Sequence, residues 1–209
     1  MTSFVLVTAT GTEVGKTWVA CAVARALARE AKRVVAIKPF ESGGGDDGER
    51  LAAATGQGEP RRALVRLREP LTPALAAERE GVKLDFDATM GEIERLARGA
   101  DVALVEGAGG VLSPLTWDAD ATTLARRLGA RVLLVAPDAL GALSATLTAL
   151  HALRAASLEV LGVVLVEPAA RDASTGTNAA VLRRRLSAPV IEVARGDERA
   201  ALRVADLFA

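Results

Sequence analysis

The chain has 209 residues, enough for one moderately sized globular domain, and we expect a single domain over residues 1–209. Lys plus Arg and Asp plus Glu both number 26, so the formal net charge is zero. Proteins that bind nucleic acid or an anionic membrane surface usually carry a basic surplus, so this balance argues against both partners. Only four of the 26 cations are lysines, Lys16, Lys32, Lys38 and Lys83.

Short apolar runs of strand length alternate with longer segments of helical periodicity, which is typical of repeated βα units around a parallel sheet. The expected strands are 4–8, 33–38, 101–106, 131–136, 160–166 and 190–193, and the expected helices are 16–30, 90–98, 119–128, 142–155, 177–186 and 197–207. Asp118 is expected to cap the helix at 119–128. The strands are rich in valine, which favours burial on both faces. We therefore predict an α/β fold, doubly wound, with a mainly parallel sheet flanked by helices.

A phosphate-binding loop is expected between the first strand and the first helix, at residues 9–17 (ATGTEVGKT). Backbone N–H groups at a helix start face phosphate oxygens, the ammonium of Lys16 would meet the terminal phosphates, and the hydroxyl of Thr17 would ligate Mg²⁺. Three residues, rather than the standard four, separate Gly11 from Gly15. The flanking strand and helix support a nucleoside triphosphate site, and hence a fold of P-loop NTPase type.

Two further glycine-rich segments follow expected strands. Residues 42–48 (SGGGDDG) suit a mobile active-site loop. Residues 107–110 (GAGG) leave the backbone after Glu106 free of large side chains, so a substrate could approach main-chain N–H groups closely. In an open α/β sheet, ligands bind beyond the carboxyl ends of the strands, where both segments are expected.

Three motifs in order, residues 8–17 (TATGTEVGKT), 38–43 (KPFESG) and 105–110 (VEGAGG), strongly resemble those of the dethiobiotin synthetase family. The resemblance covers nearly the whole chain. It implies an ATP- and Mg²⁺-dependent cyclo-ligase of biotin biosynthesis that converts 7,8-diaminopelargonate, CO₂ and ATP to dethiobiotin, ADP and phosphate. A carbamate forms on one amine, takes the γ-phosphoryl group as a mixed carbamic-phosphoric anhydride, and is attacked by the second amine. A homodimer that completes the diamine site is also implied.

The resemblance assigns roles to matching positions of this sequence. The implied catalytic residues are Thr12, Lys16 and Lys38. The implied nucleotide-binding residues are Glu13, Val14, Gly15, Lys16, Thr17, Trp18, Asp47, Glu106, Gly107, Ala108 and Gly109. The implied substrate-binding residues are Lys38, Ser42, Gly110, Gly141, Ala142 and Leu143, and the implied Mg²⁺ ligands are Thr17, Asp47 and Glu106.

These roles suit phosphoryl transfer, which depends mainly on positioning and charge neutralisation and needs no nucleophilic side chain. Lys16 and Lys38 are expected to flank the carbamate and the transferring phosphoryl group from two adjacent strand ends. Asp47 is preferred as the metal ligand because it stands four residues before Leu51, as in the family pattern, and Asp46 is the alternative.

The sequence departs from the family at both ends of the nucleotide site. Ala9 replaces the usual first glycine of the loop, which would cost about 1 kcal/mol if position 9 required a positive φ, and Gly11 stands where Asp is common. At the nucleobase end, Val166 replaces an Asn that reads adenine, and Glu192 replaces a Gly. Without side-chain hydrogen bonds to the base edge a site discriminates weakly, so we predict relaxed nucleotide choice.

Two other functions remain as alternatives. A partner-regulated P-loop ATPase switch of the partitioning or septum-positioning type carries a lysine five residues before that of the Gly-Lys-Thr motif, where this chain has Gly11. The second alternative is a relative that binds nucleotide without turnover. Both motif lysines and the implied metal ligands are present, which argues against it.

The sequence also carries signals of location. The single cysteine, Cys21, excludes an internal disulfide and a cysteine-cluster metal site, and fits a reducing compartment. The first residues lack the basic region of a signal peptide. The longest apolar stretch, 132–150, is interrupted by Pro137, Asp138 and Gly141, so it is not expected to span a membrane. We therefore expect a cytoplasmic protein.

Overall fold

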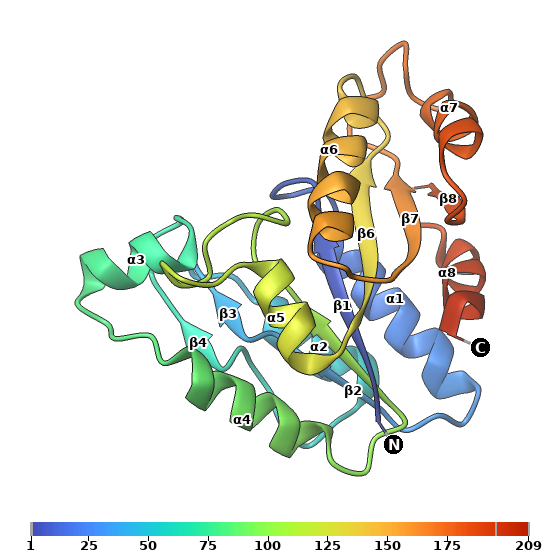
Figure 1. Ribbon diagram of the computed structural model, residues 1–209. Coiled ribbons are helices and arrows are strands. Elements are labelled where there is room, and N and C mark those ends of the chain that lie inside the picture. Colours follow the sequence, from blue (N-terminus) through green and yellow to red (C-terminus); the bar gives the residue numbers. More distant parts are fainter. Residues whose placement is uncertain (1, 195, 209) are drawn as a thin grey trace.

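A central sheet of six parallel strands dominates the structure, a computed structural model that describes residues 2–194 and 196–208 (Figure 1). The strands are β1 (Ser3–Ala9), β2 (Val34–Ile37), β5 (Val102–Glu106), β6 (Arg131–Pro137), β7 (Val160–Val166) and β8 (Val190–Val193). Their order across the sheet is β2-β5-β1-β6-β7-β8. The six expected strands and the parallel, doubly wound fold are therefore confirmed.

The strand order corrects one sequence-based expectation. β1 and β2 are not adjacent, because β5 lies between them and pairs with both. The register aligns Val7 of β1 with Glu106 at the end of β5. The lysines that follow β1 and β2 therefore lie on either side of a strand that ends in a carboxylate.

Both faces of the sheet are covered by helices, which explains why its strands lack polar alternation. One face carries α1 (Lys16–Arg29), α2 (Asp47–Thr55) and α8 (Glu198–Ala205), and the other carries α4 (Phe86–Ala97), α5 (Ala121–Leu128), α6 (Ala142–Ala155) and α7 (Asn178–Arg185). Within β1, Leu6 packs on the face covered by α4, α5, α6 and α7, whereas Val5 and Val7 pack on the face covered by α1, α2 and α8. A short 3₁₀ helix, η1 (Asp206–Phe208), follows α8.

The six expected helices are present, with shifted starts where the capping residue differs. α5 begins after Asp120 rather than Asp118, because the Asp120 carboxylate accepts hydrogen bonds from the backbone N–H groups of Thr122 (2.8 Å) and Thr123 (3.0 Å). α4 begins four residues before the expected 90, because Asp85 accepts from the backbone N–H of Ala88.

A side lobe between β2 and β5 was not predicted from the sequence. It contains β3 (Phe40–Glu41), which pairs in parallel with β4 (Val65–Arg66), and α3 (Pro73–Glu80). In Figure 1 this lobe stands beside the main sheet, at the left. α2, also unpredicted, begins inside the segment expected to be a loop, so residues 42–46 alone connect β3 to it. Two-residue strands are too short to show a periodicity in the sequence.

Candidate functional site

The predicted phosphate loop lies where β1 ends and α1 begins, at the point where the strand order changes direction. Ala9 is the last residue of β1, so the missing glycine causes no backbone strain there. The left-handed conformations fall instead at Glu13 (φ 56°) and Gly15 (φ 96°). A Cβ on Gly15 would also approach Cγ1 of Val166 to 3.2 Å, so this glycine serves both the turn and the contact with β7.

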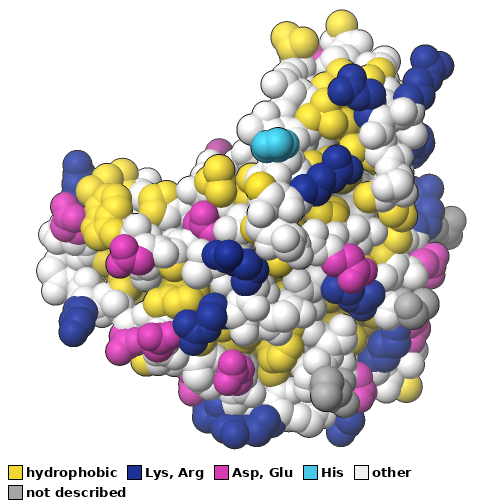
Figure 2. Space-filling model, in the orientation of Figure 1, with side chains coloured by type: hydrophobic (Ala, Val, Ile, Leu, Met, Phe, Trp, Pro, Cys, Tyr) yellow, Lys and Arg dark blue, Asp and Glu magenta, His cyan; other side chains and the backbone are white. Residues whose placement is uncertain are grey.

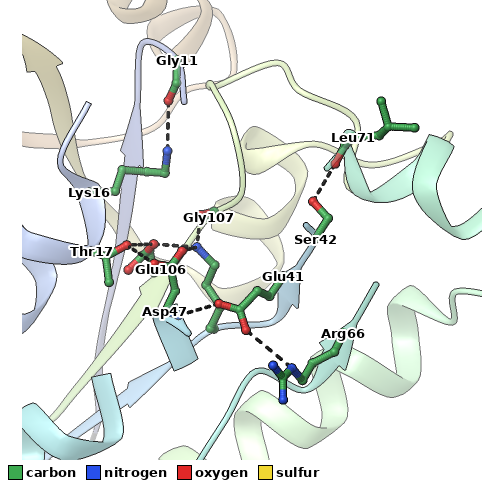
Figure 3. Close-up of polar contacts among 11 residues, drawn as sticks. Gly11, Lys16, Thr17, Glu41, Ser42, Asp47, Arg66, Leu71, Glu106 and Gly107 are labelled. Atoms are coloured by element: carbon green, nitrogen blue, oxygen red, sulfur yellow. Dashed lines mark hydrogen bonds and ion pairs between the residues drawn. The ribbon is translucent and has the colours of Figure 1, made fainter. Parts of the chain in front are cut away.

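Four polar side chains from four elements meet beside this loop (Figure 3). Lys38 follows β2, Glu106 ends β5, Thr17 is in the first turn of α1, and Asp47 begins α2. The Lys38 ammonium donates to Glu106 Oε1 at 2.6 Å and to Asp47 Oδ2 at 2.7 Å. The Thr17 hydroxyl lies 2.7 Å from Asp47 Oδ1 and 2.9 Å from Glu106 Oε1. We call Thr17, Lys38, Asp47 and Glu106 the central cluster.

Burial and charge compete within the central cluster. Lys38 and Glu106 are only 4% and 1% exposed. Burial by itself would lower the pKa of Lys38, but the two carboxylates outweigh it and raise that pKa above its usual value. Burial raises the pKa of Glu106, whereas Lys38 overcomes the partial burial of Asp47 and lowers its pKa. Lys38 is therefore a firmly charged lysine that holds two carboxylates together.

Lys16 is in a different electrostatic position. Its ammonium donates to the carbonyl oxygen of Gly11 at 2.9 Å, across the phosphate loop. Burial, reinforced by repulsion from Lys38, lowers the pKa of Lys16 to about 8. A bound anion at the loop would reverse this effect, which suits a residue that meets phosphate oxygens.

The central cluster fits a small divalent cation. Glu106 Oε2 is buried and has no hydrogen-bond partner, so a cation would satisfy an otherwise isolated oxygen. The described residues contain no group of three or more His, Cys, Asp or Glu side chains placed to hold a metal. Two carboxylates and a hydroxyl nevertheless suit Mg²⁺, which keeps several waters and takes its remaining ligands from substrate phosphates. Asp47, not the exposed Asp46, reaches this cluster.

The glycine-rich segment after β5 runs directly along the phosphate loop. The backbone N–H of Gly107 donates to the carbonyl of Val7 at 3.0 Å, and a Cβ on Gly110 would approach the carbonyl oxygen of Thr10 to 3.3 Å. Gly109 has a φ of 69°. These glycines therefore permit close packing of two loops, a purpose that the sequence-based interpretation, which considered only access for substrate, missed.

Several sequence-predicted residues lie outside the central cluster. Thr12 and Glu13 are exposed on the phosphate loop, beside half-buried Val14. Ala108 is half-buried in the glycine-rich segment, and the Ser42 hydroxyl donates to the carbonyl of Leu71 at 2.6 Å. Trp18 lines a cavity of about 280 Å³ between α1 and α2, whose lining includes none of the cluster residues.

The implied substrate-binding residues Gly141, Ala142 and Leu143 do lie at a helix start. Gly141, with a φ of 89°, is the N-cap of α6, and Ala142 and Leu143 form its first turn. Within residues 2–194 and 196–208, no hydrogen bond or ion pair joins this turn to the central cluster. Its place in the substrate site therefore remains a prediction.

A second cavity, of about 200 Å³, opens at the ends of β7 and β8, where the nucleobase was expected. Glu192 lines it and forms an ion pair with Arg183 at 3.0 Å. Sequence reasoning missed Asp138 and its partner Asn178, which lie at this end of the sheet. The buried carboxylate of Asp138, which lines this cavity, accepts hydrogen bonds from Asn178 Nδ2 at 2.8 Å and from the backbone N–H of Gly176 at 2.7 Å. The available signal was an acidic residue directly after the buried strand β6.

The strand order, the loop after β1 and the lysine and threonine that open α1 define a P-loop nucleotide-binding protein. Residues 4–195 match the family model described as an AAA domain. Among solved structures, the septum site-determining protein MinD of Pyrococcus horikoshii, in complex with Mg-ADP, is similar with a TM-score of 0.57. That match covers 97% of this chain and 86% of MinD at 17% identity, so it concerns the fold alone.

Curated relatives narrow this class. An ATP-dependent dethiobiotin synthetase BioD from a Caulobacter species is 46% identical over 173 residues, covering 77% of this chain and 74% of the relative. The protein of the same name from Nitrosospira multiformis is 36% identical over 198 residues, covering 92% and 88%. The chain belongs to the dethiobiotin synthetase family.

Proposed function

We propose that this chain, as a single domain over residues 1–209, is an ATP-dependent dethiobiotin synthetase that closes a ring on 7,8-diaminopelargonate with CO₂. The reaction consumes ATP and releases ADP and phosphate. Family membership supports the activity, and one observation supports its location: Lys38 bridges Asp47 and Glu106 beside the phosphate loop. No nucleophilic side chain is required, because positioning and charge neutralisation dominate phosphoryl transfer.

The reaction has three balanced steps. One substrate amine adds to CO₂ and loses a proton, which gives a carbamate. A carbamate oxygen attacks the γ-phosphorus of ATP, ADP leaves, and a carbamic-phosphoric anhydride forms. The second amine attacks the carbonyl carbon and gives up a proton to solvent, phosphate leaves, and the five-membered urea ring closes.

The chain's own residues have separate tasks in these steps. The loop N–H groups and Lys16 bind the phosphates, and Lys38 neutralises the carbamate and its developing anhydride. Thr17, Asp47 and Glu106 would hold Mg²⁺, which supplies charge neutralisation of the phosphate oxygens when bound. The lysines approach from β1 and β2, on either side of β5. A compact ammonium is needed at both positions, because a planar guanidinium presents its charge differently.

The partitioning-type ATPase switch is the runner-up. The similarity to MinD concerns only the fold. At position 11, where such switches carry a lysine, this chain has a glycine whose carbonyl accepts from Lys16. The relatives that match over most of the chain are synthetases. A nucleotide-binding relative without turnover would show ATP binding but no product.

Phosphate release in the presence of ATP, Mg²⁺ and bicarbonate, measured with and without 7,8-diaminopelargonate, tests the activity. We expect release that depends on the diamine, together with dethiobiotin in the mass spectrum. Lys38→Ala should lower kcat by orders of magnitude while nucleotide binding persists, and Lys83→Ala, at an exposed lysine, should behave as wild type. Release that does not depend on the diamine would contradict the synthetase activity.

We further propose a cytoplasmic homodimer that binds neither nucleic acid nor membrane. Leu112, Trp117 and Leu140 are large hydrophobic side chains left exposed in the single chain. Figure 2 shows a surface hollowed between the side lobe and the arm that carries α6 and α7. No helix within the described residues is both long and apolar enough to cross a membrane. A molar mass of one chain by light scattering would contradict the dimer.

A further inference from the structure

Glu41 is a buried acidic residue to which the proposed reaction gives no task. It is the second residue of β3 and only 3% exposed. Its Oε1 accepts a hydrogen bond from the backbone N–H of Asp47 at 2.5 Å. A Cβ on Gly45 would lie 3.2 Å from the same oxygen, so the carboxylate fills the space beneath loop 42–46. Glu41 thus connects β3 to the first residue of α2.

Arg66 holds this arrangement from the neighbouring strand (Figure 3). The β3–β4 register places it opposite Glu41, and its Nε lies 3.8 Å from Glu41 Oε2. Its guanidinium also pairs with Glu49 at 3.2 Å and donates to the carbonyl of Gly45 at 3.2 Å. One arginine therefore contacts Glu41, the loop and the first turn of α2.

The contact matters because of what Asp47 does with its side chain. The Asp47 N–H belongs to the first turn of α2, where no intrahelical acceptor exists. Glu41 accepts from that N–H, while the Asp47 carboxylate faces Thr17 and Lys38. Fixing the backbone of Asp47 thus fixes the direction of its carboxylate. Groups that hydrogen-bond to a metal-ligating residue typically change the metal affinity without contacting the metal themselves.

We propose that Glu41, held by Arg66, is a positioning residue that fixes the Asp47 carboxylate and thereby sets the affinity of the site for a divalent cation. The inference rests on the proposed function, in which Asp47 is a cation ligand. It adds Glu41 and Arg66, neither of which lies within the phosphate loop or the glycine-rich segment.

Mn²⁺ binding to the full chain with ADP present, followed by electron paramagnetic resonance, tests the proposal. Glu41→Ala should weaken Mn²⁺ binding by about 10- to 100-fold. Glu41→Gln keeps an oxygen acceptor for the Asp47 N–H and should recover most of the affinity. Glu80→Ala is the matched control, because the Glu80 carboxylate also accepts from backbone N–H groups, those of Arg68 (2.6 Å) and Glu69 (2.9 Å), but does so in the side lobe. Its Mn²⁺ affinity should equal that of wild type.

Two further readouts separate positioning from a merely structural role. The amide hydrogen of Asp47 should exchange faster in Glu41→Ala and at the wild-type rate in Glu80→Ala. In turnover assays, the Mg²⁺ concentration for half-maximal rate should rise while kcat at saturating Mg²⁺ stays near that of wild type. Should Glu41→Ala fail to fold, Glu41→Asp retains the charge, falls short of the Asp47 N–H, and should show the same loss.

Asp47→Asn serves as the reference and should also weaken Mn²⁺ binding. If it does so while Glu41→Ala and Glu41→Asp bind Mn²⁺ as wild type does, the positioning role is wrong and the proposed cation site stands. If Asp47→Asn binds Mn²⁺ normally, the cation role of Asp47 is wrong, and the inference fails with it.

Discussion

Removing the Lys38 ammonium should destabilise the protein before any substrate is added. Lys38→Met keeps the length and much of the volume of the side chain but deletes its charge. The 2.6 Å and 2.7 Å contacts to Glu106 and Asp47 are then lost. Two carboxylates are left facing each other with only the Thr17 hydroxyl to share.

The size of the effect follows from burial. Removing one partner of a buried ion pair costs about 3 to 5 kcal/mol, because the other charge stays buried and uncompensated. The Glu106 carboxylate would be such a buried and uncompensated charge. The Asp47 side chain is 32% exposed and can reach water. We therefore expect about 3 kcal/mol, the lower end of that range. For a chain of this length the corresponding fall in Tm is about 6–12 °C.

Urea unfolding in EDTA measures this loss directly. Lys83→Met, at an exposed lysine, should stay within about 0.5 kcal/mol of wild type. In the double variant Lys38→Met/Glu106→Gln, neutralising the buried carboxylate should recover about 2 kcal/mol. A Lys38→Met protein as stable as wild type, or no recovery in the double variant, would show that Lys38 does not compensate the buried charge of Glu106.

The pH dependence of Lys38→Met provides an internal check. Burial already raises the pKa of Glu106 above its ordinary 4.5, and losing Lys38 raises it further. The folded variant then binds a proton that the unfolded chain has released, so its stability should fall as the pH rises above 4.5. A difference between variant and wild type that stays constant with pH would contradict an uncompensated carboxylate.

Three further predictions concern the loop, α2 and the nucleobase. The folded chain without ligand binds fewer protons at Lys16 than the unfolded chain between about pH 8 and 10.5, so this residue's contribution to stability rises with pH there. ADP should restore the charge, and calorimetry in buffers of different ionisation enthalpy should show proton uptake at about pH 9 and none at about pH 6; equal uptake at both would be inconsistent with a lowered pKa. Gly48→Ala should destabilise by about 2 kcal/mol or more, because a Cβ there would overlap the backbone of Ala63. Gly91→Ala, in open space within α4, should stabilise by about 0.5–1 kcal/mol in the same unfolding assay, and similar effects at both sites would argue against the steric explanation. Initial rates with ATP, CTP, GTP and UTP should lie within about a hundredfold of one another, and a stronger preference for ATP would show that Val166 does not relax the choice.

The main sheet could be predicted from the sequence because each strand is a run of four or more mostly apolar residues. Burial on both faces produces such runs, and the helices between them carry clear apolar periodicity. The side lobe could not be predicted in the same way. β3 and β4 are two residues each, and they pair where the tertiary structure places Phe40 opposite Val65 and Glu41 opposite Arg66.

The candidate site was predictable residue by residue but not as an arrangement. The phosphate-loop motif and the family resemblance single out Lys16, Thr17, Lys38, Asp47 and Glu106, and the last four are in contact. The insertion of β5 between β1 and β2 is a long-range pairing that no local pattern encodes, and it places Glu106 between the lysines.

Buried acceptors were harder still to recognise. Nothing in the neighbourhood of Glu41 distinguishes it from a solvated glutamate, because its role depends on the N–H of a residue six positions away. Asp138 is similar, since its partner Asn178 lies 40 positions further along the chain.

The scarcity of lysine has a practical consequence for handling the protein. Lys16 and Lys38 are buried, whereas Lys83 is exposed and Lys32 is partly exposed. Among the lysines, amine-reactive dyes or resins will therefore modify Lys32 and Lys83 in the folded protein, and the arginines do not react with these reagents. The enzyme can thus be labelled or immobilised through its lysines while the two amines of the proposed site stay protected.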